Sequence, residues 1–133
     1  MNRLIFIGLL ASLISACNPS TQNHEKMNEP NYSTKVVEIT NFSLHHGVSI
    51  EDFKNLATQM QAAFLSKQHG FVKRTLTISA DSIWTDIVYW QDQQSFENAM
   101  KLAETSEEVL PFMEKIDFNS VKMNLTTPII LEE

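Results

Sequence analysis

Apolar residues recur along this chain with two different periods, and each period predicts one type of secondary structure. Alternation of apolar and polar residues predicts four strands, at residues 35–44, 71–79, 83–90 and 121–125. Apolar residues three and four positions apart predict a helix between Ser49 and Gly70 and a second helix after Asp92, with a further helical turn around Pro111. The predicted order is strand, helix, strand, strand, helix, strand.

The ends of the two helices carry recognisable signals. Ser49 is followed three residues later by Asp52, a variant of the capping box that satisfies free backbone N–H groups at a helix start. Asp92 can cap the second helix in the same way, and Gly70 is expected to be the C-terminal cap of the first.

This order predicts an α+β domain of the ferredoxin-like βαββαβ type. Its two helices can cover only one face of a four-stranded sheet. The strand at residues 83–90 is apolar on both faces, with Trp84 and Trp90 on one face and Ile87 and Tyr89 on the other. Since a strand of this kind must be covered twice, we expect a second copy of the chain to pack sheet to sheet as a homodimer.

The first residues of the chain have a secretory pattern. Arg3 precedes an apolar run at residues 4–14, which is much shorter than the roughly 20 residues of a membrane-spanning helix. The following Leu13 to Cys17 resembles the lipobox of bacterial lipoproteins, and Cys17 is the only cysteine in the chain. The resemblance implies a signal peptide at residues 1–16, with cleavage before Cys17 and acylation of that residue. With more than one acyl chain on Cys17, the protein is expected to be anchored stably in a membrane.

Composition predicts a tether at residues 17–34 and one folded domain at residues 35–133. The segment after Cys17 is rich in small polar residues and proline, and a flexible chain of its length spans roughly 20 to 25 Å. The formal net charge of the chain is −6, and the sequence contains no dense run of Lys and Arg, so nucleic acid is not expected as a partner. Because Asn18 and not aspartate follows the cysteine, the periplasmic face of the outer membrane is the expected location.

The segment from Trp90 to Ala99 resembles a family. A tryptophan, a short polar turn and a helix bearing phenylalanine follow an apolar strand, as in antibiotic-biosynthesis-monooxygenase (ABM) domains, and Gly70-Phe71 fits as well. The resemblance spans most of residues 35–127 and implies a dimeric α/β barrel. The family includes cofactor-free oxygenases of aromatic polyketides and quinols, haem-degrading enzymes and proteins without known activity.

The haem-degrading branch uses a first-strand asparagine, a tryptophan in the second helix and a histidine ligand further along. Asn41 matches the first of these, but Ala99 and Val109 occupy the approximate positions of the other two. Haem is therefore not predicted, and neither is any other cofactor.

Three residues are candidates for a site. Asn41 is expected on the face of Val37 and Ile39, toward the helices, where it can donate to a substrate carbonyl or oxyanion. The alternative is a buried amide that satisfies a neighbouring backbone. His45, in the loop after the first strand, can act as a base at a pocket mouth, and the alternative is a solvated loop residue.

Asp86 shares a strand face with Trp84 and Trp90, so it is a candidate base for a planar phenol. The alternative is a carboxylate at an edge or interface, paired across the dimer. The adjacent His45 and His46 lack a third ligand at metal spacing, so no metal site is predicted.

Two function classes remain open. One is a non-catalytic, membrane-anchored module that binds a ligand or envelope partner, which the lack of an obvious catalytic set favours. The other is a cofactor-independent monooxygenase-like enzyme acting on a small aromatic or quinone-like molecule. An apolar cavity with Asn41, and with Asp86 or His45 within reach, would favour the enzyme, whereas a cavity filled by side chains would favour the binding module.

Overall fold

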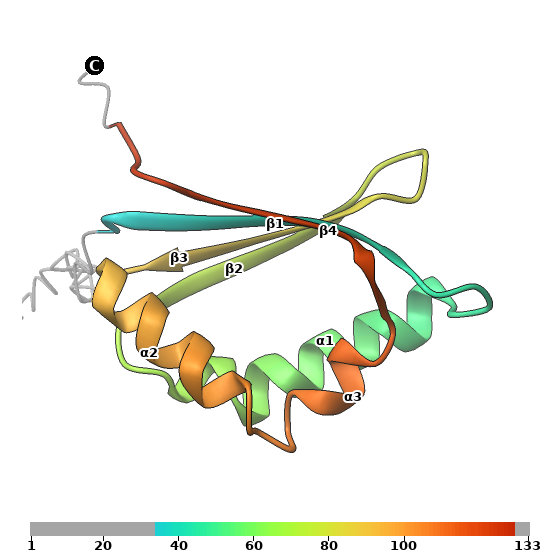
Figure 1. The fold of residues 1–133 in the computed structure, drawn as a ribbon, viewed down its shortest axis with the longest axis horizontal. Coiled ribbons are helices and arrows are strands. Elements are labelled where there is room, and N and C mark those ends of the chain that lie inside the picture. Colours follow the sequence, from blue (N-terminus) through green and yellow to red (C-terminus); the bar gives the residue numbers. More distant parts are fainter. Residues whose placement is uncertain (1–33, 130–133) are drawn as a thin grey trace, which may run out of the picture.

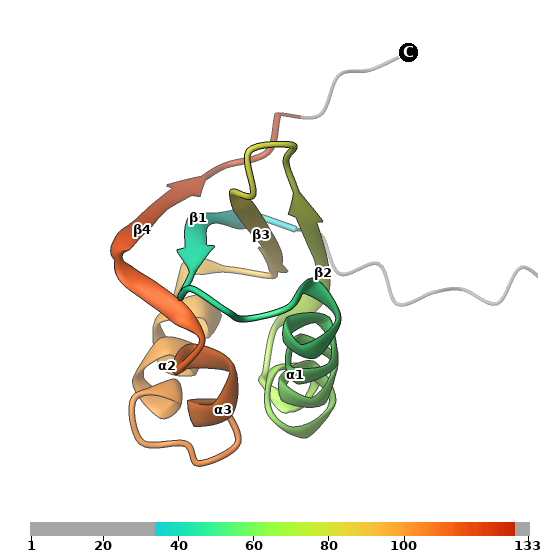
Figure 2. The same ribbon diagram turned by 90° about the vertical axis from the view of Figure 1, so that its right-hand side faces the viewer.

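The computed structural model describes residues 34–129, which fold into a curved sheet with helices on one face (Figures 1 and 2). Cys17, the predicted signal peptide and nearly all of the predicted tether lie outside the described residues. The elements, in chain order, are β1 (Val36–Leu44), α1 (Ile50–Ala63), η1 (Leu65–Lys67), β2 (Phe71–Ile78), β3 (Trp84–Trp90), α2 (Gln93–Ala103), α3 (Leu110–Met113) and β4 (Ile116–Thr126). This is the predicted α+β, ferredoxin-like order.

The sheet has the strand order β2-β3-β1-β4, and all three pairings are antiparallel. The strand β4 begins at Ile116, five residues before the predicted start. A register shift between β1 and β4 lies between Asn41 and Ser43, where the Ser43 N–H donates to Ser120 Oγ across 2.8 Å. This irregularity breaks the alternation of apolar residues, and for that reason the alternation does not predict the first part of β4.

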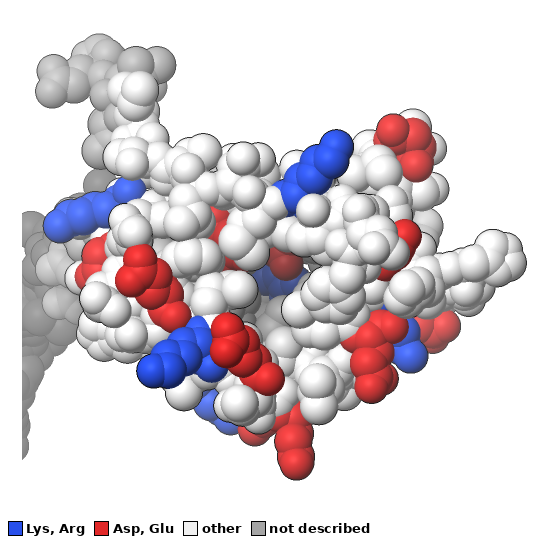
Figure 3. Space-filling view, viewed as in Figure 1, with Lys and Arg blue, Asp and Glu red and all other residues white. Residues whose placement is uncertain are grey.

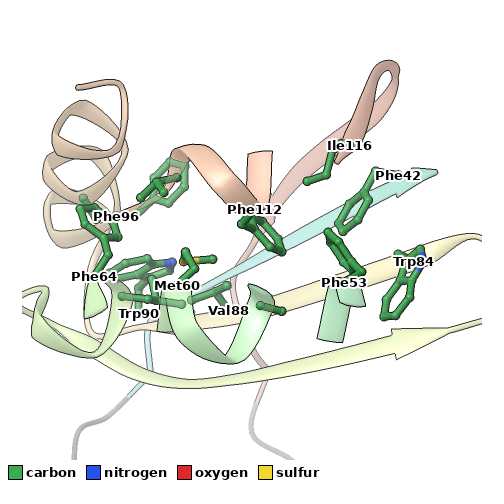
Figure 4. Packing of buried hydrophobic residues seen from close by; sticks show 14 residues of the cluster. Phe42, Phe53, Met60, Phe64, Trp84, Val88, Trp90, Phe96, Phe112 and Ile116 are labelled. Carbon is green, nitrogen blue, oxygen red and sulfur yellow. The ribbon is translucent and has the colours of Figure 1, made fainter. Parts of the chain in front are cut away.

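The helices and the sheet enclose one aromatic core (Figure 4). Phe53 of α1 is fully buried and packs edge to face on Phe42 and Trp84, with ring centroids 5.7 and 4.8 Å away. Phe112 of α3 stacks on Phe53 at 4.9 Å. These contacts fasten α1 and α3 to the same end of the sheet, and aromatic burial of this kind dominates core stability.

Both predicted N-terminal caps are confirmed. The Asp52 N–H donates to Ser49 Oγ at 3.0 Å, and the Ser95 N–H donates to Asp92 Oδ1 at 2.8 Å. The prediction for Gly70 is wrong, because α1 ends at Ala63 and a 3₁₀ turn follows it. That tighter turn buries both Phe64 and Leu65 against the core. Gly70 instead takes φ +75° just before β2.

The side of β1 that faces the helices differs from the prediction. Phe42 is in the core, and Glu38 and Thr40 share its face. Val37, Ile39 and Asn41 therefore lie on the outer face, and the prediction that Asn41 points toward the helices is wrong. The prediction assumed that polar residues face outward. Glu38 instead faces inward, because its carboxyl group has hydrogen-bond partners in the buried interior.

Candidate functional site

A cavity of about 240 Å³ opens between the helix-facing side of the sheet and the helices α2 and α3. Figure 3 shows a hollow on the face seen in Figure 1, with charged atoms at its floor. The lining is mostly apolar and includes Phe42, Met60, Val88, Ala99, Val109 and Ile116. Four lining residues carry polar side-chain atoms: Glu38, Thr40, Asp86 and Trp90. A largely apolar pocket with few convergent polar groups is the usual form of a small-molecule site.

Glu38 is the most distinctive of these polar residues. It is 9% exposed, and its two carboxyl oxygens are held separately. The indole N–H of Trp90 donates to Oε2 at 3.2 Å, while the Thr40 hydroxyl donates to Oε1 at 3.2 Å. Burial raises the pKa of Glu38 above its ordinary value, and the hydrogen bond from Trp90 opposes that rise. The result is a positioned carboxyl group that exchanges its proton nearer to neutral pH.

Asp86 lies beside Glu38 but is engaged differently. Its carboxylate accepts two hydrogen bonds from the guanidinium of Arg74, from Nε at 2.7 Å and from a terminal nitrogen at 2.6 Å. The side chains of Arg74 and Asp86 are 2% and 12% exposed. Such a bidentate, buried pair is a strong, geometrically fixed interaction. Asp86 is therefore paired within its own chain, with Arg74.

Arg74 also ties the site to both neighbouring helices. Its other terminal nitrogen donates to the Ala57 carbonyl oxygen of α1 at 3.1 Å, and its guanidinium lies 5.0 Å from the centre of the Phe112 ring of α3. The ion pair thus fixes the floor of the cavity to the helices.

Register places the two acidic residues diagonally across the same strand pair. Glu38 pairs with Val88, and Asp86 pairs with Thr40, so Glu38 and Asp86 are diagonal neighbours on the helix-facing side. The negative charge of Asp86 further raises the pKa of Glu38, and the charge of Arg74 lowers it by a smaller amount. With Asp86 held by Arg74, Glu38 is the acidic residue of the cavity lining that forms no ion pair.

The structure does not bring the three predicted site residues together. Asp86 is in the cavity, as a partner of Arg74. Asn41 is on the opposite face of the sheet, where Oδ1 accepts a hydrogen bond from Thr85 at 2.7 Å. His45 is exposed in the turn after β1, and its backbone N–H donates to the Lys115 carbonyl. Cys17 lies outside the described residues.

The two site residues that the sequence reading missed are Glu38 and Arg74. Arg74 lies on the apolar face of Leu76, whereas Glu38 shares the face of Phe42 with the polar Thr40. A charged residue on a face that must be buried signals a paired or functional group, because an unpaired buried charge is too costly to keep. That signal is present in the sequence at Arg74 but not at Glu38, whose face also carries Thr40.

No group of three or more potential metal ligands occurs among residues 34–129. Over the same residues, no helix is long and apolar enough to cross a membrane.

Comparison with known proteins identifies the fold. No family model and no curated protein sequence matches this chain. Among solved structures, SnoaB, a cofactor-independent oxygenase from Streptomyces nogalater, is 22% identical with a TM-score of 0.57, over 74% of this chain and 96% of that one. The ActVA-Orf6 monooxygenase from Streptomyces coelicolor, in complex with the ligand nanaomycin D, is 19% identical with a TM-score of 0.56, over 75% and 94% of the two chains.

A candidate antibiotic biosynthesis monooxygenase from Bordetella bronchiseptica is 16% identical with a TM-score of 0.61, over 73% of this chain and 99% of that one. At these identities the likeness shows the fold alone. The described domain therefore has the ABM-like fold that the sequence resemblance implied, while its activity must be argued from its own residues.

Proposed function

We propose that the cavity binds a small planar aromatic molecule and that the domain oxidises this molecule with dioxygen, without a cofactor, using Glu38 as the acid–base group. The observation that carries the proposal is the buried Glu38 carboxyl in an apolar cavity, fixed by Trp90 and Thr40. The similarity of fold to SnoaB, a cofactor-independent oxygenase, adds support.

The chemistry can be written for 1-naphthol as a probe. The ionised Glu38 carboxylate accepts the phenolic proton, and the resulting naphtholate is electron-rich at ring carbon C4. Dioxygen adds at C4 to form a hydroperoxide, which loses water to give 1,4-naphthoquinone. One oxygen atom enters the new carbonyl, and the other leaves as water with two hydrogens of the naphthol. Glu38 gives the phenolic proton to the peroxide, then accepts the C4 proton as the O–O bond breaks and passes it to the departing hydroxide, so substrate electrons alone reduce the oxygen.

An oxygen electrode tests the proposal. Wild-type protein should consume one dioxygen for each naphthoquinone formed, and the Glu38→Gln variant should be slower by a factor of about 100 or more, the usual size of a general-base contribution. Glu97→Gln is the matched control, because Glu97 is an exposed residue of α2 that does not line the cavity.

Quenching of tryptophan fluorescence measures binding separately, because Trp90 lines the cavity. Binding of 1-naphthol without oxygen uptake would favour the non-catalytic module instead. Absence of binding would contradict both versions of the proposal.

We also propose that Cys17 is lipidated and that the domain is held at the periplasmic face of the outer membrane. The support is the lipobox resemblance at Leu13 to Cys17 and the polar segment that follows. Fatty-acid labelling and membrane partition should both be lost in Cys17→Ala. If that variant keeps both properties, the anchor is not at Cys17.

The homodimer is proposed from the outer face of the sheet, opposite the helices (Figure 2), where Ile39, Ile87 and Tyr89 are only half-buried in the single chain. A sheet face with this apolar content is normally covered. Light scattering of the detergent-solubilised chain at micromolar concentration should give twice the protomer mass, after subtraction of the detergent. A monomer mass would contradict the proposal.

A further inference from the structure

The rim of the cavity contains large apolar side chains that are exposed to solvent. Met100 of α2 and Phe118 and Met123 of β4 all line the cavity, and they are 37%, 58% and 40% exposed. Their positions continue the apolar lining from the floor of the cavity to its mouth. An exposed apolar surface that joins a ligand cavity indicates contact with a further apolar partner.

The mouth lies at the edge of the sheet, because β4 is an outer strand in the order β2-β3-β1-β4. The start of β1, from which the N-terminal segment leaves the domain, is near this edge. Thr40 pairs with Met123. Since a strand rises about 3.4 Å per residue, Met123 is about 17 Å along the strand from Lys35.

The segment between Cys17 and Lys35 is long enough for the mouth of the cavity to reach a membrane in which Cys17 is anchored. Residues 18–34 separate the proposed anchor at Cys17 from Lys35, and an unstructured chain of that length has a typical end-to-end distance of roughly 20 to 25 Å. This reach exceeds the distance from Lys35 to the rim. A domain anchored at Cys17 can therefore lay its rim on the bilayer.

Charge indicates the type of contact. The formal net charge of the chain is −6, so anionic headgroups would repel it and ionic attraction would not hold it. Exposed methionine and phenylalanine side chains can enter the interfacial region of a neutral bilayer through burial of apolar area.

We propose that the rim formed by Met100, Phe118 and Met123 rests on the bilayer, and that the cavity takes from it a ligand with an aromatic ring and an apolar chain. The ring occupies the cavity beside Glu38, and the chain passes across the rim into the lipid. The inference rests on the proposed aromatic site and the proposed anchor at Cys17, and it narrows the ligand class to lipid-soluble naphthol- or quinone-like molecules.

The first test locates the rim on vesicles. The full anchored chain is reconstituted in phosphatidylcholine vesicles with an environment-sensitive dye on Phe118→Cys, or on Leu102→Cys as the matched control. Leu102 is 56% exposed but does not line this cavity. Brominated lipids should quench the dye at position 118 at least threefold more than at position 102. Equal quenching would overturn the contact, and failure of the chain to float with vesicles would overturn the anchor and with it the inference.

The second test compares ligands. Quenching of tryptophan fluorescence gives the affinity for 1,4-naphthoquinone and for the same ring with a ten-carbon chain, measured with the detergent-solubilised full chain. The ten-carbon chain of the ligand should tighten binding at least tenfold. The double variant Phe118→Ser/Met123→Ser should reduce this gain in affinity to less than threefold. The control Leu102→Ser/Leu110→Ser removes two exposed apolar side chains elsewhere and should leave the gain intact.

The outcomes separate the two proposals. Equal affinity for the two quinones would refute the lipid-soluble ligand while leaving the aromatic site in place. Absence of binding by both quinones would refute the aromatic site itself.

Discussion

The indole N–H of Trp90 donates a hydrogen bond to Glu38 Oε2 across 3.2 Å, and this bond joins the end of β3 to the beginning of β1 inside the cavity. Trp90 is 1% exposed and is held by edge-to-face contacts with Phe71 and Phe96, with ring centroids 6.0 and 6.2 Å away. A rigid aromatic donor therefore fixes the orientation of the one cavity carboxyl that is free of a cationic partner. Orientation by a packed neighbour is what a catalytic acid or base requires.

Trp90→Phe should raise the pKa of Glu38 further, because the hydrogen bond from Trp90 favours the ionised carboxylate. Carboxyl ¹³C NMR of the labelled protein measures this pKa directly. Trp84→Phe is the control, since Trp84 lies in the core at the other end of β3 and makes no hydrogen bond to Glu38. A lower pKa in Trp90→Phe would contradict the account of the site.

Glu38→Gln should change the pH dependence of stability. The pKa of Glu38 in the folded protein exceeds its ordinary value of 4.5, so the native state holds a proton that the unfolded chain releases. Stability from this proton is complete below pH 4.5 and is lost as pH rises through the folded pKa. The glutamine variant has no such loss. Its free energy of unfolding, from urea denaturation, should gain on the wild type as pH rises, by about 1.4 kcal/mol for each pH unit between the two pKa values. A constant difference from pH 4 to 9 would be inconsistent with a raised pKa.

Arg74→Gln should destabilise the domain by about 3 to 5 kcal/mol, because it leaves Asp86 charged and unpaired in a buried position. The double variant Arg74→Gln/Asp86→Asn should lose less than Arg74→Gln alone. Lys54→Gln is the matched control, since Lys54 and Glu51 form an exposed pair at 3.8 Å, and it should cost less than about 1 kcal/mol. Urea denaturation measures all three, and a similar cost for the two single variants would argue against the buried pair.

Gly70→Ala should be more destabilising than Gly47→Ala. Both glycines have positive φ, +75° and +87°, so both alanines pay a backbone cost of about 1 to 2 kcal/mol. At Gly70 the new Cβ would also lie 2.1 Å from Ser95 Oγ of α2, whereas at Gly47 no atom lies within 4 Å. Thermal unfolding compares them, and equal losses would show that the close approach between Gly70 and α2 is not required.

Much of the fold could be predicted from sequence because its signals are local. The caps at Ser49 and Asp92 are short-range hydrogen bonds, and the alternation in β3 follows from strand geometry. The start of β4 and the end of α1 could not be predicted in this way. The register shift opposite Asn41 and the burial of Phe64 and Leu65 in a 3₁₀ turn are set by tertiary packing.

The candidate site was predicted only in part, for a related reason. Asp86 was placed on the correct face of β3 because Trp84 and Trp90 define that face. The face of β1 was assigned wrongly because Val37 and Ile39 are apolar and Glu38 is not. Burial of Glu38 depends on Trp90, 52 residues away, and burial of Asp86 on Arg74, 12 residues away. Pairings over such distances do not appear in local periodicity.

The most direct test of the central claim is a carboxyl ¹³C NMR titration of Glu38 with and without saturating 1-naphthol. We expect a Glu38 pKa above 4.5 in the free protein and a further change in that pKa when naphthol binds, and the Glu38 carboxyl signal should be absent from spectra of Glu38→Gln. A pKa at or below 4.5 that naphthol leaves unchanged would contradict the assignment of Glu38 as the functional group of this cavity.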